Sequence, residues 1–437
     1  MSLLTRDCFF EKKKKWTFED FLGEKYRENE ENFMEKKSSK KKVIFEIALL
    51  VALIVFVFVM LFSDSSTSPE QIWEAIKTAR YQYFAAALGV LILYTVVYSC
   101  SLVVIAKGTK AKVKVGDLYL ISTSEFFFNG ITPAAVGGQP FQVFAFKQVG
   151  VDASKSTGMI LMNFLCSLIA QLIVSLISLS FYPLILEYAS GMIGLFWLGF
   201  FVTALGAIVF GALGVSKTFR KVMIKFMNWF CTWKIMKKTK NVDKKFEKYI
   251  TNAQRAFKDA WTHKGLFIIA LLSKVLAYAI LYSIPFFILK AINVPYGFEK
   301  GQINATMFFE VMCITSFAMI TANYIPTPGA TGALELAFKN FLLPILIATG
   351  SAEASVVAAE TATASAGVIL WRFVTFYILM LLSFSCYFFF VKKKHIKYDR
   401  LKKDEECEDN LDNSLENSNE TTEEIEVVED KSDEKIE

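Results

Sequence analysis

The sequence predicts an all-α fold, a polytopic helical membrane protein with two broken or re-entrant helical segments. Three observations predict it. Of the 437 residues, 54% are hydrophobic, and 42 are Phe. Several apolar runs reach the roughly 20 residues that a helix needs to cross about 30 Å of hydrocarbon. Two other apolar stretches are interrupted by a Thr-Pro pair followed by glycines, in the strings TPAAVGGQPF (132–141) and TPGATGALEL (327–336).

The apolar runs predict the spans in chain order. Seven runs are long enough to cross a bilayer: 43–62, 82–106, 158–181, 191–215, 266–289, 303–325 and 363–391. Two shorter runs, 118–131 and 338–348, flank the interruptions and are too short to cross alone. The first run follows a charged arm, and no small-residue cleavage pattern comes after it. It is therefore expected to be a span and not a cleaved signal peptide.

Charge divides the chain into three regions: a charged N-terminal arm (1–42), a transmembrane domain (43–391), and a tail (392–437) that is basic and then acidic. Excess Lys and Arg mark cytoplasmic loops, so both termini are expected in the cytoplasm. The tail has too few apolar residues to form a core and is expected to be disordered. In the basic 216–264 loop, Trp229, Phe230 and Trp233 fit a helix that lies at the level of the lipid headgroups. The alternative is that the basic residues only reflect the usual excess of Lys and Arg in cytoplasmic loops.

Metal, disulfide and nucleotide chemistry are not expected. The seven cysteines are scattered without a CxxC spacing, and the two histidines lie in basic flanks. No GxxxxGK[ST] string is present, so this chain is not expected to use ATP. We therefore predict no cofactor, no metal site and no catalytic residue.

The two interruptions predict a binding site inside the membrane. Backbone groups in hydrocarbon need partners, so a broken helix is expected only where protein or a wet cavity surrounds it. The half-helix after each break would point free N–H groups at a guest such as a lipid phosphate. Thr132 and Gln139 add polar side chains at the first break, and Thr327 and Glu335 at the second. A kinked helix without ligand is the alternative.

The two breaks are entered from opposite faces in the predicted topology, which allows an inverted repeat. Charged residues in apolar runs support a polar interior, because a charge near the bilayer centre costs about 2.5–3.5 kcal/mol on insertion scales. We predict that Lys274 or Arg372 pairs with Glu310 or Glu335, and that Glu125 also faces the interior. A purely structural ion pair is the alternative.

Three strings resemble a known family: NGITPAAVGGQPFQVFAFKQVGV (129–151), YIPTPGATGALELAF (324–338) and VILWRFVTFY (368–377). They are similar to the lysylphosphatidylglycerol synthase transmembrane region, also described as the flippase-like domain family. Ala330 and Ala333 stand where that family commonly has glycine. The motif positions that match are Thr132, Pro133, Gly137, Gly138, Gln139, Pro140, Pro326, Pro328, Gly329, Gly332, Glu335 and Arg372.

The resemblance implies a bacterial plasma-membrane domain that moves an anionic or aminoacylated phospholipid such as lysylphosphatidylglycerol to the outer leaflet. This lipid protects the cell against cationic antimicrobial peptides. In bifunctional members a separate cytoplasmic domain first transfers lysine from lysyl-tRNA to phosphatidylglycerol. Such a domain needs about a hundred residues or more, and the 216–264 loop is not expected to hold one. Phosphatidylglycerol lysyltransferase, or its membrane subunit, is the alternative function, and a non-transporting scaffold is the third.

The predicted partners are a membrane phospholipid and a separate soluble synthase or envelope enzyme. Nucleic acid is not expected, and a homo-oligomer is left open. The substrate-binding candidates are Thr132, Pro133, Gly137, Gly138, Gln139, Thr327, Pro328, Gly329, Gly332, Glu335, Arg372, Glu310, Lys274 and Glu125.

Overall fold

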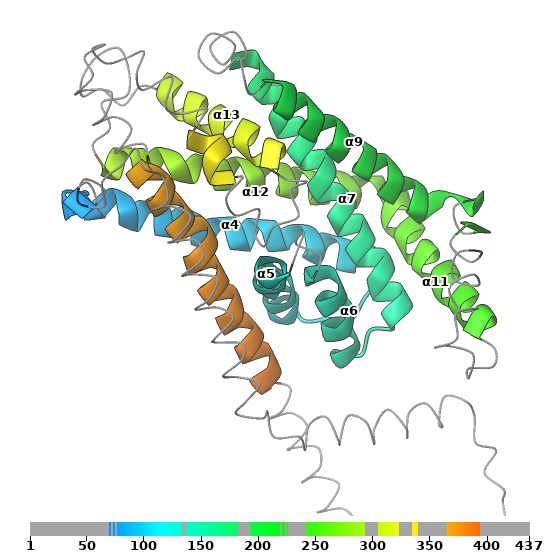
Figure 1. Cartoon of the computed structure of the whole chain (residues 1–437). Coiled ribbons are helices and arrows are strands. Elements are labelled where there is room, and N and C mark those ends of the chain that lie inside the picture. The colour runs from blue at the N-terminus through cyan, green and yellow to red at the C-terminus, as the bar shows by residue number, and fades with distance from the viewer. Residues whose placement is uncertain are drawn as a thin grey trace, which may run out of the picture. The chain divides into compact units, whose positions relative to one another are not determined.

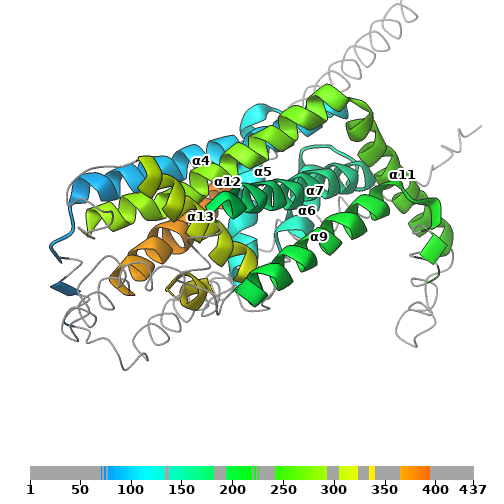
Figure 2. The ribbon, with the colours of Figure 1, turned by 90° about the horizontal axis from the view of Figure 1, so that it is seen from above.

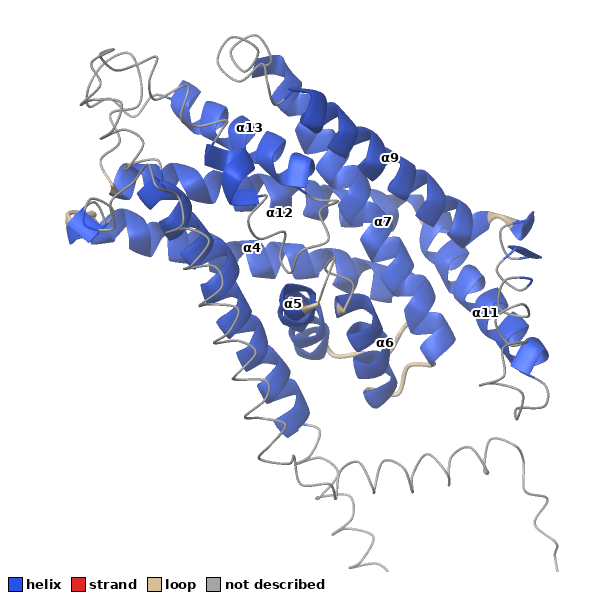
Figure 3. Cartoon of the chain, viewed as in Figure 1, coloured by secondary structure: helices blue, strands red, loops and turns tan. Residues whose placement is uncertain are grey.

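A computed structural model gives the fold. It describes residues 70, 73–74, 77–132, 137–181, 193–218, 221–222, 225, 242–292, 305–322, 334–339 and 365–393. The chain divides into two units, Met1–Phe56 and Val57–Glu437, and every described residue belongs to the second. Within those residues all regular secondary structure is helical, as Figure 3 shows. The predicted all-α class is confirmed.

The helices follow the predicted order (Figure 1). Five are long and apolar enough to cross a membrane, and they confirm five predicted spans. The predicted span 43–62 lies outside the described residues, and the predicted span 303–325 contains the shorter α13. The helices are α4 (Tyr81–Gly108), α5 (Val115–Ile131), α6 (Gly138–Gln148), α7 (Ala153–Ser178) with the 3-10 turn η2 (Leu179–Phe181), α9 (Ile193–Val215), α11 (Val242–Thr262), α12 (Lys264–Ala291), α13 (Ala305–Ala322) and a helix over Ser365–Lys393.

The exposed faces of the spans are apolar, as a lipid environment requires. On α9, for example, Phe201, Leu205 and Ile208 are 63%, 60% and 69% exposed. Leu272 and Leu276 of α12 are also exposed. A helix that is apolar on all sides belongs in a protein core or a membrane. Because these side chains are not covered by protein, we assign them to lipid contact.

The helices bury two apolar clusters between them. Near the α9–α13 contact, Phe196 and Phe317 stack with their ring centroids 4.0 Å apart. In the second cluster, Phe146 of α6 and Phe257 of α11 are fully buried together with Met159 of α7. Figures 1 and 2 both show α12 running beside α4, and these two helices share an extensive contact.

The basic 216–264 loop contains a long packed helix, α11. Its buried residues include the small Ala253, Ala256 and Ala260 together with Phe257 and Gln254. It lies against α7 so closely that a Cβ on Gly158 would overlap the Ala253 carbonyl oxygen and the Phe257 amide. This half of the loop is therefore part of the helical domain. The headgroup-level helix predicted from Trp229, Phe230 and Trp233 lies outside the described residues.

The first break is present where the sequence predicts it. Helix α5 ends at Ile131 and α6 begins at Gly138, and the two short helices contact each other. At the second break, α13 ends at Ala322 and a helical turn occupies 334–339. The re-entrant arrangement and the inverted repeat remain predictions.

Candidate functional site

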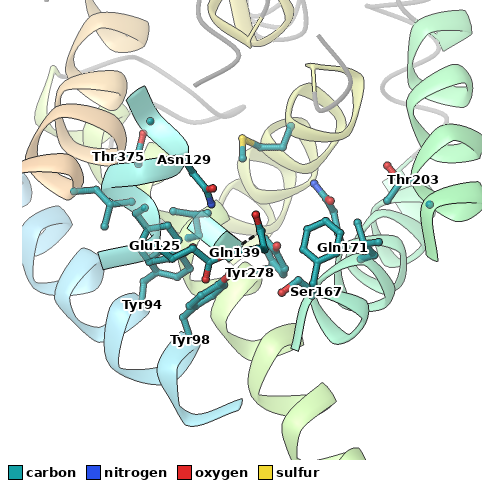
Figure 4. Close-up of a pocket in the computed structure, with 18 of the residues that line it drawn as sticks. Tyr94, Tyr98, Glu125, Asn129, Gln139, Ser167, Gln171, Thr203, Tyr278 and Thr375 are labelled. Carbon is teal, nitrogen blue, oxygen red and sulfur yellow. Dashed lines mark hydrogen bonds between the residues drawn. The ribbon is translucent and has the colours of Figure 1, made fainter. Parts of the chain in front are cut away.

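A cavity of about 800 Å³ lies among the helices. Every described span contributes to its wall, together with α5, α6, α11 and α13. Figure 4 shows Glu125 and Asn129 of α5 and Gln139 of α6 in this cavity, with Ser167 and Gln171 projecting from α7. The α7 and α9 side of the wall is mainly apolar. Its members there include Leu161, Phe164, Leu168, Val202 and Phe210.

Glu125 connects the two halves of the first broken helix. Its side chain is buried, and it lines the cavity. Glu125 Oε2 accepts a hydrogen bond from Gln142 Nε2 at 2.8 Å, and Oε1 accepts one from Gln139 Nε2 at 3.3 Å. Both amides come from α6. A single carboxylate therefore joins α6 to α5 at two points.

The backbone donors at the start of α6 are already occupied. Gly137 N donates to Thr132 Oγ1 at 2.9 Å, and Gly138 N donates to Asn129 Oδ1 at 2.9 Å. The Thr132 hydroxyl in turn donates to the Phe128 carbonyl at 2.7 Å. The prediction of free N–H groups for a phosphate is therefore wrong for these two donors, because side chains at the end of α5 already accept hydrogen bonds from them.

The first turn of α6 is packed too closely for any side chain at Gly138. A Cβ there would overlap Glu125 Cγ and Asn129 Oδ1. The glycine is thus required because the two acceptors of α5 approach the α6 backbone directly. The Glu125 side chain therefore occupies space directly next to this helix start.

Lys274 lies behind the cavity wall and not in it. This α12 side chain is fully buried, and its Nζ is 3.0 Å from the ring centroid of Tyr98, which lines the cavity. It interacts electrostatically with Glu125. Within the described part of the chain its Nζ has no hydrogen-bond partner and no ion pair. The predicted pairing of Lys274 with Glu310 or Glu335 is therefore wrong.

The structure contains one of the predicted ion pairs. Arg372 Nε lies 2.6 Å from Glu335 Oε1, and the two side chains are only 5% and 8% exposed. Arg372 lines the cavity, and its Cζ is 4.7 Å from the ring centroid of Phe376. The helix changes to π geometry directly after it, over Phe373–Ile378 (η5). Glu310 of α13 is partly buried and lies outside the cavity lining.

An aromatic wall surrounds Glu125, and sequence reasoning missed it. The rings of Tyr98 and Phe126 have centroids 4.8 Å apart, and those of Tyr94 and Tyr98 are 5.6 Å apart. Tyr278 and Tyr282 form a second pair at 5.8 Å, from α12. All five rings line the cavity. The i, i+4 spacing of tyrosines in two apolar runs was the available signal, because such residues share one helix face.

The predicted site residues that the structure describes separate into four groups. Glu125, Gln139 and Arg372 line the cavity, whereas Thr132, Gly137 and Gly138 lie where α5 ends and α6 begins. Glu335 and Lys274 contact lining residues from behind, through Arg372 and Tyr98. Glu310 is outside. The remaining candidates lie outside the described residues: Pro133, Thr327, Pro328, Gly329 and Gly332.

Apolar exposed spans around a cavity with charged and aromatic walls define a polytopic membrane protein with an internal site. Comparison with protein families matches residues 47–383 to the lysylphosphatidylglycerol synthase TM region. The chain belongs to this family. It is also 25% identical over 283 residues to the "Uncharacterized protein MG306 homolog" of Mycoplasma pneumoniae, over 62% of this chain and 68% of that protein.

Proposed function

We propose that this chain is a lipid translocator of the bacterial plasma membrane, with both termini in the cytoplasm. The observation that carries the proposal is the cavity of about 800 Å³, which joins charged and polar groups to an apolar α7–α9 side within a membrane domain. Pockets that hold small molecules commonly measure about 300–1,000 Å³. A phospholipid needs both surfaces, one for its headgroup and one for the start of its acyl chains.

Arg372 is the proposed contact for the lipid phosphate. Arg372 lines the cavity, and Glu335 orients its guanidinium through the 2.6 Å contact at Nε. Arg suits phosphate because its planar group offers donors in a fixed fork. Gln139 and Asn129 provide further polar contacts in the same cavity. Leu161, Phe164 and Phe210 face the guest on the apolar side.

The family match indicates a membrane role related to lipids, and it selects the first lipid to test. We propose an anionic or aminoacylated phospholipid such as lysylphosphatidylglycerol. Its display on the outer leaflet would lower surface negative charge and so contribute to resistance against cationic antimicrobial peptides. A separate soluble synthase or envelope enzyme is the proposed partner that supplies the lipid.

A leaflet assay tests translocation. The purified full-length chain is reconstituted into vesicles that contain fluorescent phosphatidylglycerol or lysylphosphatidylglycerol, and an impermeant reductant is added. We expect label in the inner leaflet to become accessible faster than in protein-free vesicles. The variant Arg372→Met/Glu335→Leu, which removes the charges together, is expected to lose this acceleration. Equal rates with and without the protein, for both lipids, would contradict the proposal and favour a scaffold.

A second arm addresses the enzyme alternative. Lipids are extracted from cells that express this chain alone and from cells with an empty vector. We expect no new lysyl-lipid in either sample. A new lysyl-lipid that depends on the chain would instead support a phosphatidylglycerol lysyltransferase or its membrane subunit.

A further inference from the structure

Four exposed lysines lie at the end of α4 and in its connection to α5, and we call them the lysine surface: Lys107, Lys110, Lys112 and Lys114. The last three alternate with Ala111 and Val113, which are partly buried and pack against the apolar cluster that contains Phe146 and Val151. A backbone hydrogen bond from Ala111 N to Ala106 O, at 2.9 Å, holds the connection to the end of α4. The packing of the apolar residues therefore leaves the lysines on the outside.

The charge of the lysine surface is not offset by the part of the chain that the structure describes. Within that part, none of the four lysines forms an ion pair or a side-chain hydrogen bond. The acidic residue that follows them most closely along the chain, Asp117, is buried and pairs with Lys393 Nζ at 2.6 Å. The surface thus presents four positive charges to a partner from outside the described residues.

The C-terminal helix ends beside the lysine surface. Lys393 is the last residue that the structure describes, and its partner Asp117 donates its backbone N–H to the Lys114 carbonyl at 3.0 Å. Two direct contacts therefore connect the point where the chain leaves the helical domain to the lysine surface. The next residues, 394–403, can span at most about 36 Å, so the segment that follows them begins close to this surface.

That segment is strongly acidic. Residues 404–437 contain sixteen Asp and Glu, but only two basic residues, Lys431 and Lys435. The segment lies outside the described residues, and its charge is given by the sequence. In the proposed orientation it starts beside the cytoplasmic leaflet, whose negative surface repels acidic side chains. The lysine surface offers it opposite charges close to its point of attachment.

We infer that the acidic segment 404–437 docks on the lysine surface of its own chain. Exposed ion pairs are weak one at a time. Several of them together hold a tethered segment, because a short connection keeps its effective concentration in about the millimolar range. The inference goes beyond the proposed function, since none of the four lysines lines the cavity. An anionic membrane surface and a second copy of the chain are the other occupants, and the test separates them.

Carbodiimide cross-linking tests the contact directly, because it joins a lysine amine to a carboxylate that touches it. The full-length chain is placed in phosphatidylcholine nanodiscs that hold one copy each, and linked peptides are identified by mass spectrometry. We expect links between residues 404–437 and the lysine surface at low salt. These links should fall several-fold at about 1 M salt, where the Debye length is about 3 Å. The Lys393–Asp117 pair, at 2.6 Å, is the internal control and should cross-link at low salt.

Proteolysis provides a second measurement that leaves the sequence of the acidic segment unchanged. In Lys107→Gln/Lys110→Gln/Lys112→Gln/Lys114→Gln we expect a Glu-specific protease to cleave within 404–437 roughly tenfold faster than in the wild type, since four weak ion pairs together reach about that factor. The matched control removes four lysines that are exposed elsewhere: Lys217→Gln/Lys221→Gln/Lys225→Gln/Lys258→Gln. It should be cleaved at the wild-type rate.

The inference is overturned if the control pair Lys393–Asp117 cross-links and the acidic segment does not. Equal cleavage of the segment in the wild type and in the variant of the lysine surface would also overturn it. Loss of the links in phosphatidylglycerol nanodiscs would assign the lysines to lipid headgroups instead. Links that appear only between labelled and unlabelled chains, in nanodiscs that hold two copies, would assign them to a second copy.

Discussion

Glu335 and Arg372 are 37 positions apart in the chain and meet as a buried ion pair, with 2.6 Å between Oε1 and Nε. The pair joins the short helical turn at 334–339 to the helix that contains η5. It also fixes the guanidinium of Arg372, a residue that lines the cavity. One contact thus connects the second motif of the chain to the candidate site.

Removing one partner of this pair should destabilise the protein strongly. Glu335→Gln takes away the carboxylate that accepts from Arg372 Nε, and breaking a buried ion pair costs about 3–5 kcal/mol of unfolding free energy. The joint variant Glu335→Leu/Arg372→Met should recover most of this loss, because no charge is then left buried. Thermal unfolding in detergent measures both.

An exposed pair serves as the control for this prediction. Lys77 Nζ and Glu74 Oε1 are 3.2 Å apart, with side chains 52% and 66% exposed. Exposed ion pairs contribute less than about 1 kcal/mol, so Glu74→Gln should barely shift the unfolding midpoint. A shift equal to that of Glu335→Gln would mean that burial of the Arg372 pair does not matter.

The first turn of α6 should not tolerate a methyl group. In Gly138→Ala the new Cβ would overlap Glu125 Cγ and Asn129 Oδ1, and overpacking typically costs about 1–3 kcal/mol. Gly116→Ala is the matched control on α5, since nothing lies within 4 Å of a Cβ there. We expect the control to be neutral or to stabilise by about 0.5–1 kcal/mol through its helix preference. Equal losses in unfolding experiments would contradict the packing argument.

The stability of the protein should depend more on the hydroxyl group of Thr132 than on the shape of this side chain. Thr132→Val keeps the volume but leaves the Gly137 N–H without its acceptor. Gly137 is half-buried, so the loss is expected near the net worth of one hydrogen bond, about 0.5–1.5 kcal/mol. Thr132→Ser keeps the oxygen and should retain most of the stability. The comparison of the two unfolding midpoints decides the matter, and a stable Val variant beside an unstable Ser variant would refute the role of this hydrogen bond.

Helix α11 should pack less closely against α7 when a methyl group is added at Gly158. A Cβ at this position meets backbone atoms of α11, at the Ala253 carbonyl and the Phe257 amide, and backbone moves less readily than a flexible side chain. Gly158→Ala is therefore expected to destabilise by about 1–3 kcal/mol and to speed proteolysis within 242–262. Gly265→Ala, where a Cβ meets nothing within 4 Å, should behave as the wild type. Unchanged proteolysis in Gly158→Ala would count against this contact.

The spans could be predicted from the sequence because hydropathy alone determines them. An ion pair between Arg372 and an acidic residue of another apolar run could be predicted, since a charge in an apolar run needs a partner. The environment of Lys274 could not, because its contact with Tyr98 joins two separate helices, and no local pattern shows which residues face each other. The docking of α11 was missed for a related reason. Its contact face depends on Ala253, Ala256 and Gly158, which add little to hydropathy.

The prediction of free N–H groups at the start of α6 is wrong, although the sequence contains a signal for their capping. Glu125, Asn129 and Thr132 lie at i, i+4 and i+7, and this spacing places polar acceptors on one face of α5. That face meets α6 in the structure. The polar face that caps α6 thus lies in the helix before the Thr-Pro and glycine string, and not in the string itself.

Formal charges balance at the candidate site. Glu125 with Lys274, and Glu335 with Arg372, sum to zero. A membrane voltage does about 2.3 kcal/mol of work per 100 mV on each charge that crosses. If the proposed translocation is correct, these four groups together add no net charge that would make the movement of the empty protein depend on voltage. Any current that accompanies transport would then report the charge of the cargo and not that of the protein.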